Sequence, residues 1–397
     1  MAQEQGIRPV TELHPLAGHD EARAALIQAN AAARLPAALL VQGMRGVGKQ
    51  RLALWLAQLQ LCEAPTREGP CGTCRPCRLV LGLEHPDLHW YFPVSRPTGV
   101  SGDRLSEALE SARADALAEL REQPLRPSLG DEMRGLYLGL MQSLRRRAQS
   151  RPTLSAVQVF IIADAELLVP QESSPEAANA LLKLLEEPPQ CTRMILTSSE
   201  PGRLLPTIRS RSVPLHLSPL STRNVASFMV AHLGIEDDVA TWAATLGQGS
   251  IGRALGFLPD DDGPGPLETL RRDALKLLEA ALVGSPAAGF AAALEQSSAG
   301  ARRLVELFTF GEEWLRDLAA VASGAEERVL SQDSVDRLRA MAARLSASPA
   351  DLARAFPAFE EARELARGNV NPQLIVSGLV RRLRESLLTP APAGAKA

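Results

Sequence analysis

The stretch "AALLVQGMRGVGKQRLALWLAQLQL" (37–61) joins a short apolar run, a glycine-rich loop and a run with apolar residues at helical spacing. Strand, glycine loop and helix, in that order, form the context that a phosphate-binding P-loop requires. Further apolar runs follow at 88–92, 157–163, 193–198 and 212–217, separated by helical segments. Such runs are typical of strands in a parallel sheet that is buried on both faces. The sequence therefore predicts an α/β P-loop module with helices on both faces of a mostly parallel sheet.

The loop itself departs from the P-loop pattern at one position. Gly43, Gly48 and Lys49 match G-x-x-x-x-G-K-[ST], and Gly46 adds a flexible position. The last position holds Gln50, whose side chain lacks the compact hydroxyl that coordinates Mg²⁺. We therefore expect no hydrolysis here. Binding of ATP or ADP stays open, as does a glycine-rich turn that holds no ligand.

A second acidic motif, "VFIIADAE", ends the apolar run at 157–163. Asp164 lies where a P-loop NTPase places the carboxylate that supports Mg²⁺. Ala165 takes the place of the glutamate that polarises the attacking water, and Glu166 comes one residue later. A shift of one residue at a strand end turns the side chain toward the other face. The motif thus indicates that a second group needed for hydrolysis, the water-polarising glutamate, is missing. In the alternative interpretation, both acids only cap the next helix.

Four of the five cysteines gather in "CEAPTREGPCGTCRPC", with the spacing C-x8-C-x2-C-x2-C. Two overlapping C-x2-C turns allow Cys71, Cys74 and Cys77 to converge, and Cys62 completes a tetrahedral set. Four soft ligands with no open position predict structural zinc. An iron–sulfur cluster and free thiols are the alternatives. Cys191 stands alone and is expected to be an ordinary thiol.

The composition is that of a globular protein with many helices. The chain has 397 residues, of which 45% are hydrophobic, 22% charged and 4% aromatic. A formal net charge of −3 argues against binding nucleic acid through an overall positive field. The chain has no apolar run of transmembrane length, and its start, "MAQEQGIRPV", lacks the regions of a signal peptide. We therefore expect a cytoplasmic location, where a cysteine cluster indicates metal binding and not disulfides.

The remaining segments differ in character. Residues 93–150 are predicted as a charged, largely helical insertion, in which "SLRRRAQ" (143–149) is either a solvated helix face or a contact for phosphate or acidic groups. No strand signal follows Leu217. "PDDDGPGP" (259–266) has the composition of a linker. Helices are predicted over 267–388, followed by a disordered tail.

Several stretches together carry a family resemblance. They are "HPDL" (85–88), "ANALLKLLEEPP" (178–189), "LLPTIRSRS" (204–212) and "GSIGRALGF" (249–257). With the loop and the cysteines, they make the chain resemble the bacterial DNA polymerase III delta-prime family, whose members are subunits of the sliding-clamp loader. The similarity is clear over about residues 10–258 and extends to the rest by architecture only.

The resemblance implies an AAA+ module over 1–217 with an inserted zinc module, a helical lid over 218–258 and a helical collar over 267–388. It also implies a hetero-oligomeric ring in a bacterial cytoplasm, with gamma/tau and delta subunits as partners. The sliding clamp and primer–template DNA would be met through that complex. The family acts within the DNA polymerase III holoenzyme.

The resemblance also assigns roles to two arginines. Arg253 stands at the place of the sensor arginine in the lid. Ser210, Arg211 and Ser212 match the family's S-R-C motif, with serine in place of the cysteine. In the family this arginine enters the nucleotide site of a neighbouring gamma subunit, where a planar, permanent cation stabilises developing phosphate charge. The residue type alone would indicate only a solvated surface charge.

Gln50 and Ala165 favour the delta-prime interpretation over its sibling, the gamma/tau ATPase, which normally keeps G-K-[ST] and a D-E pair. We therefore predict a stator that hydrolyses no ATP itself and donates Arg211 to a neighbour. A gamma/tau-type ATPase and a zinc-bearing DNA-binding protein are the alternatives.

Overall fold

The computed structural model describes residues 13–101, 103–125, 134–168, 176–259, 263–296, 300–345, 348–368 and 370–388. These residues form two compact units, one reaching Leu255 and one beginning at Gly256. The predicted tail at 389–397 lies outside the described residues, as do 260–262 of the predicted linker and 102 and 126–133 of the predicted insertion.

The first unit is built on a parallel sheet of five strands. Its strand order is β2-β5-β6-β1-β7. All four pairings are parallel, and the strands of the sheet interior are almost fully buried. The apolar runs predicted as strands are confirmed: β1 (Ala38–Gln42), β2 (Leu88–Tyr91), β5 (Gln158–Ile162), β6 (Thr192–Ser198) and β7 (Val213–His216).

The strand register brings three chain segments to one edge of the sheet. Gln42, the last residue of β1, pairs with Ser198 of β6 and with His216 of β7. Ile162, the last residue of β5, pairs with Leu196. Because the strands are parallel, the loops that follow β1, β5 and β6 leave from the same edge, which is where open α/β sheets place their ligands.

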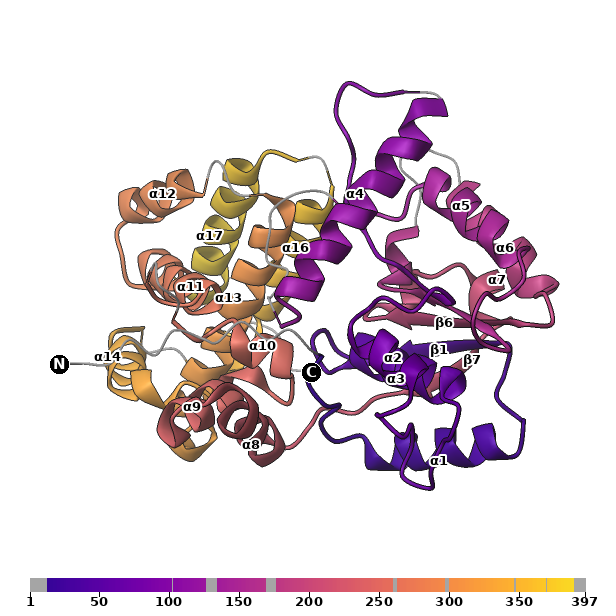
Figure 1. Ribbon diagram of the computed structural model, residues 1–397. Helices are drawn as coiled ribbons and strands as arrows, with labels where there is room; N and C mark the ends of the chain where they lie inside the picture. The colour runs from indigo at the N-terminus through magenta and orange to yellow at the C-terminus, as the bar shows by residue number, and fades with distance from the viewer. Residues whose placement is uncertain are drawn as a thin grey trace, which may run out of the picture. The chain divides into compact units, whose positions relative to one another are not determined.

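Helices cover both faces of this sheet, as predicted. Figure 1 shows α2 and α3 below the strands, with α5 and α6 above them. The helix α2 is apolar on nearly every side and buried along its whole length, as expected for a helix inside a domain. The helices are α1 (Asp20–Ala31), α2 (Lys49–Leu61), α3 (Arg75–Leu81), α4 (Asp103–Glu122), α5 (Leu138–Ala148), α6 (Glu176–Glu186) and α7 (Pro206–Arg209), with the 3₁₀ turns η1 (Ala165–Leu168) and η2 (Pro201–Arg203).

The segment predicted as an insertion is more tightly integrated than the sequence indicates. In α5, the side chains of Leu140, Met141 and Leu144 are fully buried in the core of the first unit. Two short strands, β3 (Val94–Ser95) and β4 (Arg134–Gly135), form an antiparallel pair that the sequence did not predict. Strands of two residues carry too few side chains to show a periodic pattern.

The first unit ends in three helices, α8 (Thr222–Leu233), α9 (Asp237–Gly247) and α10 (Ile251–Leu255). Ser221 caps α8, since its Oγ accepts a hydrogen bond from the Asn224 amide at 3.1 Å. Gly234 ends α8 with a positive φ of 67°.

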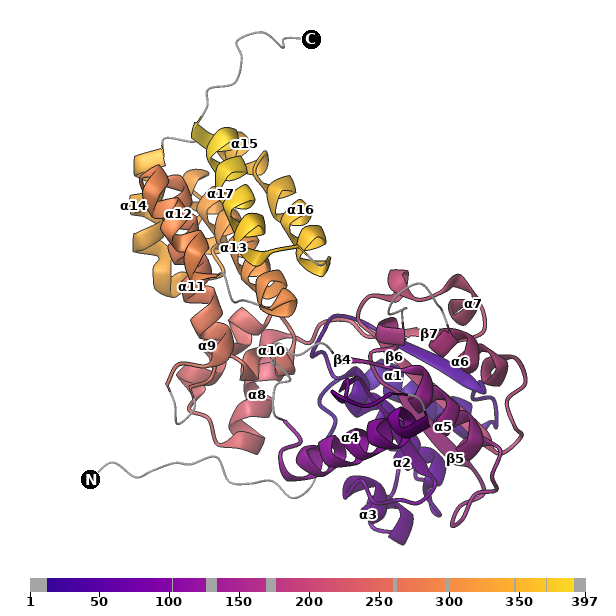
Figure 2. The same ribbon diagram turned by 90° about the horizontal axis from the view of Figure 1, so that it is seen from above.

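The second unit consists of helices around α13. Figure 2 shows α11, α13, α16 and α17 running side by side, and contacts link each to its neighbours. Trp314, Phe308 and Phe310 of α13 are buried at its centre. The helices are α11 (Pro266–Leu282), α12 (Pro286–Glu295), α13 (Ala301–Ala322), α14 (Val335–Leu345), α15 (Pro349–Ala353), α16 (Phe356–Arg367) and α17 (Pro372–Leu388), with η3 (Glu326–Arg328) and η4 (Gln332–Ser334).

A buried ion-pair network orders the second unit. The guanidinium of Arg271 binds the carboxylates of Glu268 (2.7 Å) and Asp333 (2.6 Å). The Trp314 indole donates to the Arg271 carbonyl at 2.8 Å and stacks against its guanidinium.

Among the described residues, none of the helices combines the length and apolar character needed to cross a membrane.

Candidate functional site

The glycine-rich loop leads from β1 into α2, as the sequence predicts. Gly46 and Gly48 have φ values of 73° and 107°, which residues other than glycine rarely adopt. Gly46 also lies against α10, because a Cβ there would stand 2.3 Å from Ser250 Oγ. The loop therefore has a P-loop-like path, with its lysine as the first residue of the following helix.

The ammonium group of Lys49 is held entirely by the protein. The residue is only 5% exposed. Its three N–H groups match three acceptors: Gly43 O (3.0 Å), Met44 O (2.9 Å) and Ser199 Oγ (2.8 Å). An ammonium has three donors and no more, so a phosphate could bind it only by displacing one of these partners.

The electrostatic surroundings of Lys49 follow from its burial. Desolvation lowers its pKa below the ordinary value and outweighs the neighbouring carboxylates of Asp164 and Glu166, which raise it. Arg45 lowers it further. The loop thus holds a buried cation whose charge is already offset by two nearby acids.

Gln50 and Asp164 contact each other directly. The Gln50 amide donates to Asp164 Oδ2 at 3.3 Å. In a P-loop NTPase the hydroxyl at the first position and the carboxylate at the second are both held by one Mg²⁺. Here a hydrogen bond joins the same two positions without an ion between them. Asp164 adopts a φ of 48° and its amide donates to Thr197 Oγ1, which fixes its place beyond β5.

Glu166 is turned toward the end of β6. It is 5% exposed, and its Oε1 accepts the Ser199 amide at 2.9 Å. Both carboxylates therefore accept hydrogen bonds from residues outside η1, namely Gln50 and Ser199. The alternative in which they cap this helical turn does not describe these bonds. Ser199 binds both Lys49 and Glu166, a role that the sequence did not indicate.

The start of α10 lies on the loop. Ser250 Oγ donates to the Arg45 carbonyl at 2.9 Å, and the Gly252 amide donates to the Gly46 carbonyl at 3.1 Å. The backbone nitrogen of Arg253 accordingly comes within 3.1 Å of the place that a Cβ on Gly46 would take. The structure thus brings the backbone of Arg253 to the loop, and the sensor role of its side chain stays a prediction.

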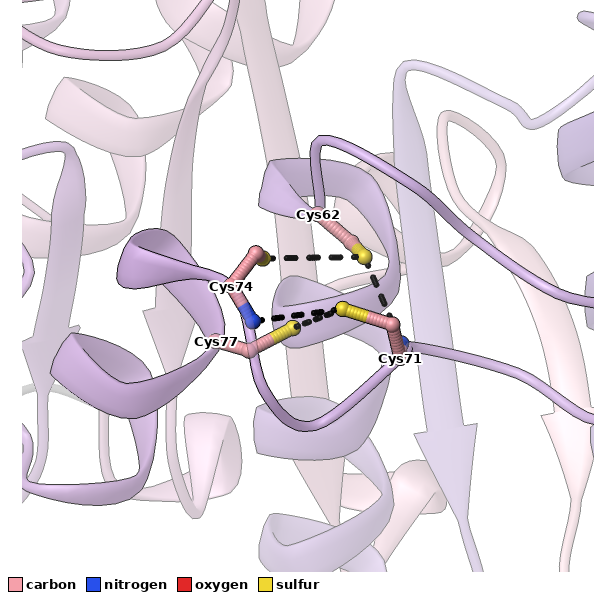
Figure 3. A group of neighbouring side chains, drawn as sticks. All are labelled: Cys62, Cys71, Cys74 and Cys77. Carbon is pink, nitrogen blue, oxygen red and sulfur yellow. Dashed lines mark hydrogen bonds between the residues drawn. The ribbon is translucent and has the colours of Figure 1, made fainter.

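The four clustered cysteines converge at the other end of α2. Figure 3 shows their thiols pointing toward one another, with Cys62 following α2, Cys74 preceding α3 and Cys77 inside α3. All four sulfur atoms lie within 4.8 Å of one another. The Cys71–Cys77 and Cys62–Cys74 sulfur pairs are 3.9 Å apart. A tetrahedron with Zn–S bonds of about 2.3 Å has edges of roughly 3.8 Å, so this donor set fits zinc.

Backbone amides support the cluster. The Cys71 amide donates to Cys62 Sγ and the Cys74 amide donates to Cys71 Sγ, each at 3.4 Å. The amides of Cys74 and Thr73 lower the pKa of the Cys71 thiol to about 6, whereas burial raises the pKa of Cys62 and Cys77. A bound cation would allow all four to be thiolates at once. Cys191 is exposed and lies outside this group.

Arg211 lies apart from the loop, just after α7. Its guanidinium bonds to Glu186 Oε1 (2.9 Å) and to the Thr207 carbonyl (3.1 Å), and its side chain is 36% exposed. Ser212, at the family's cysteine position, is buried and donates to the Ile208 carbonyl at 2.9 Å. The serine therefore preserves a small buried side chain that supports the turn carrying Arg211.

The "HPDL" stretch has a structural role that the sequence did not reveal. Asp87 is 2% exposed, and its carboxylate accepts the amides of Thr153, Leu154 and Ser155 at 2.5 to 2.8 Å. Burial alone raises the pKa of this carboxyl, but the three amides outweigh it, so that the net shift is downward. Asp87 anchors the segment that leads into β5.

The basic stretch on α5 is exposed. Arg145, Arg146 and Arg147 occupy the last turn of the helix, where positive charge complements the helix dipole. The exposure agrees with a solvated helix face. A contact of this stretch with phosphate or acidic groups stays a prediction.

Several known proteins are similar to this chain in sequence. A family model described as "DNA polymerase III, delta subunit" matches residues 18–221, just over half of the chain. "DNA polymerase III subunit delta'" of Escherichia coli is 29% identical over 225 residues, which cover 57% of this chain and 55% of that protein. The chain thus spans about half the length of this relative.

Two further relatives align over most of the chain. "DNA polymerase III subunit delta'" of Bacillus subtilis is 26% identical, over 89% of this chain and 92% of its own length. "DNA polymerase III subunit gamma/tau" of Mycobacterium bovis is 27% identical, over 96% of this chain and 62% of its own length. The similarity therefore extends to both kinds of subunit.

Proposed function

The chain belongs to the DNA polymerase III delta-subunit family, and from this membership we propose that it is a delta-prime-type subunit of the clamp loader that hydrolyses no ATP itself. In this role it is a stator of the loader ring. Its partners are gamma/tau and delta subunits, and through them the sliding clamp and primer–template DNA.

The bonds around Lys49 and Gln50 are the observation that carries this proposal. The lysine donates all of its protons to the protein, and Gln50 binds Asp164 where a metal ion would join the two positions. Ala165 removes the carboxylate that would polarise water. An ATPase of the gamma/tau type needs each of these groups for phosphoryl transfer.

Within the ring, Arg211 is the residue proposed to act on ATP. Its guanidinium is partly exposed, which leaves it within reach of a neighbouring subunit. Glu186, its ionic partner among the described residues, holds it by a surface ion pair, and such pairs contribute only about 0–1 kcal/mol. A triphosphate on a neighbour could therefore take over the guanidinium at little cost.

Zinc bound by the four cysteines has a structural role in this proposal. The cluster ties the end of α2 to α3, and its four ligands leave no position open for a substrate. The three helices α8 to α10 serve as the lid of the AAA+ module, and the helices of the second unit serve as the collar that joins the ring.

Replacing the proposed finger tests the role directly. In a loader reconstituted with gamma/tau and delta subunits, Arg211→Ala should lower DNA-stimulated ATP turnover at the dependent site by about 10³-fold, the lower end of the effect of arginine fingers. The measurement is steady-state phosphate release, together with ring assembly by size-exclusion chromatography. Arg209→Ala, an exposed arginine two residues earlier, is the matched control and should leave the rate unchanged.

Two results would contradict the proposal. An unchanged rate in the Arg211→Ala loader would remove the finger role while leaving loader membership intact. Steady ATP turnover by the isolated chain would instead favour the gamma/tau-type ATPase, the kind of subunit to which the Mycobacterium bovis relative belongs.

A further inference from the structure

The last turn of α5 and the residues after it form a basic surface that the proposed function does not use. From residue 134 to residue 163 the sequence contains no aspartate and no glutamate. Four exposed arginines of this stretch lie close together in the sequence, and we term them the α5 basic turn: Arg145, Arg146, Arg147 and Arg151. Acids near in sequence therefore do not offset their charge.

Acids from other parts of the fold do not pair with these arginines either. Over the part of the chain that the structure describes, their guanidinium groups make no ion pair and no hydrogen bond. Exposed arginines of the second unit differ, since Arg337 pairs with Glu279 and Arg339 pairs with Glu326. The charge of the α5 basic turn is thus left for a group outside these residues.

The backbone that carries the basic turn is held by side chains of the sheet. Gln158 of β5 donates from Nε2 to the carbonyls of Ala148 (3.1 Å) and Ser150 (2.8 Å). Thr192 of β6 donates from Oγ1 to the Ala148 carbonyl at 3.4 Å. Because this backbone is already fixed, a binding partner would order only the arginine side chains, which lowers the entropic cost of binding.

The unpaired charge acts on its surroundings. Burial, and after it the charges of Arg147 and Arg113, lowers the pKa of His89 to about 4. The helix dipole favours arginine in the last turn of α5, but this effect fades beyond the helix end at Ala148, and Arg151 lies past it. The positive charge therefore exceeds what the end of the helix accounts for.

The directions of the arginines indicate the shape of a partner. Successive residues of an α-helix are about 100° apart around its axis, so Arg145, Arg146 and Arg147 point in different directions around the helix end. One small anion cannot contact all three guanidinium groups, whereas an extended chain with several acidic groups can.

The surroundings of the basic turn indicate the chemistry of that chain. Its exposed neighbours Gln142, Gln149 and Ser150 are polar, so the surface lacks the apolar core of an interface between folded proteins. The formal net charge of −3 gives the chain no overall positive field, which a DNA-binding protein normally has. A short acidic peptide segment needs neither feature.

We propose that the α5 basic turn binds an acidic segment of a partner protein, an extended stretch with several aspartates or glutamates. Guanidinium groups bind carboxylates through paired N–H···O bonds, and arginine clusters that recognise acidic motifs are a recurring mode of peptide binding. This contact involves neither the glycine-rich loop nor Arg211, so it adds a docking site to the role proposed above.

A fluorescein-labelled decaglutamate peptide tests the proposal with the full-length chain. Fluorescence anisotropy at about 20 mM salt should show binding that weakens as salt is added, because salt screens exposed charges. Each surface ion pair contributes up to about fivefold to a binding constant. Binding should therefore weaken by about tenfold in a correctly folded triple variant, Arg145→Gln, Arg146→Gln and Arg147→Gln.

Two further variants control for charge and for folding. A matched triple variant replaces exposed arginines elsewhere by glutamine and should bind within about twofold of the original chain; its changes are Arg34→Gln, Arg223→Gln and Arg328→Gln. Arg151→Glu reverses one charge outside α5, so it tests the surface even if the first triple variant does not fold, and it should weaken binding several-fold.

Four results would overturn the proposal. The first is the absence of peptide binding at low salt, and the second is unchanged affinity in the folded variants of the basic turn. Equal weakening in the matched triple variant would show that the attraction is general and not local. Displacement of the peptide by duplex DNA at a lower concentration of charge than by unlabelled decaglutamate would identify nucleic acid as the partner instead.

Discussion

The two ends of α2 carry two sites of opposite character. At its first turn, Lys49 and Gln50 bond to carbonyls, a hydroxyl and a carboxylate of the protein itself. Beyond its last turn, Cys62 meets three other thiols, and the bonds around them are weak N–H···S and O–H···S contacts. The first site satisfies its polar groups internally, whereas the second brings together groups that a cation satisfies best. The comparison teaches that residues of a binding motif indicate a bound ligand only when their donors or acceptors are not already bonded to other groups of the protein.

Loss of a thiol should have the largest effect. Cys77→Ser is expected to abolish the predicted binding of one zinc ion and to lower the free energy of unfolding by about 4 kcal/mol or more, because structural zinc contributes roughly 10 kcal/mol in small zinc domains. Elemental analysis and thermal unfolding measure both. Cys191→Ser, at the exposed lone cysteine, is the control and should change neither. Iron in place of zinc, or a fully stable metal-free chain, would contradict the assignment.

Replacing the buried lysine should come next. Lys49→Met is expected to lower the free energy of unfolding by about 2 kcal/mol, because it leaves two carbonyls and the Ser199 hydroxyl without their donor. Denaturant unfolding without nucleotide measures this. The exposed Lys183→Met on α6 is the control and should stay within about 0.5 kcal/mol of the original chain. Equal stability of the two variants would show that the loop lysine is free for a ligand after all.

Restoring the missing hydroxyl should have the smallest effect. Gln50→Thr regains the hydroxyl of a P-loop, but Ala165 remains and Lys49 keeps its three partners. ATP turnover by the isolated chain is therefore expected to stay at background in a phosphate-release assay. Gln50→Ala separates the new hydroxyl from mere loss of the Asp164 bond. Steady turnover by the threonine variant would mean that Gln50 alone keeps the loop inactive.

The strands and the thiol cluster could be read from the sequence because their signals are local. The central strands β1 and β5 coincide with nearly continuous apolar runs, and the overlapping C-x2-C turns place their own sulfurs close together. The position of β3 and β4 was missed, since they have no pattern of their own and exist through pairing across the α4 segment. The three amides that bind Asp87 were also missed, because backbone donors leave no trace in the sequence.

By itself, the sequence determined the strands of the five-stranded sheet, the residues that converge at the cysteines, and the absence of a hydroxyl at Gln50. Only the tertiary structure decided which groups bind the ammonium of Lys49. Lys49 meets Ser199, 150 residues away, because the strand order places β6 beside β1. The same holds for Arg113 of α4, which donates to the Trp90 carbonyl of the outer strand β2, 23 residues away. The physical reason is that spacing along the chain fixes the geometry of residues close in sequence. The strand order of the sheet decides which residues far apart in sequence come into contact, and therefore whether a group such as Lys49 is already bonded within the protein.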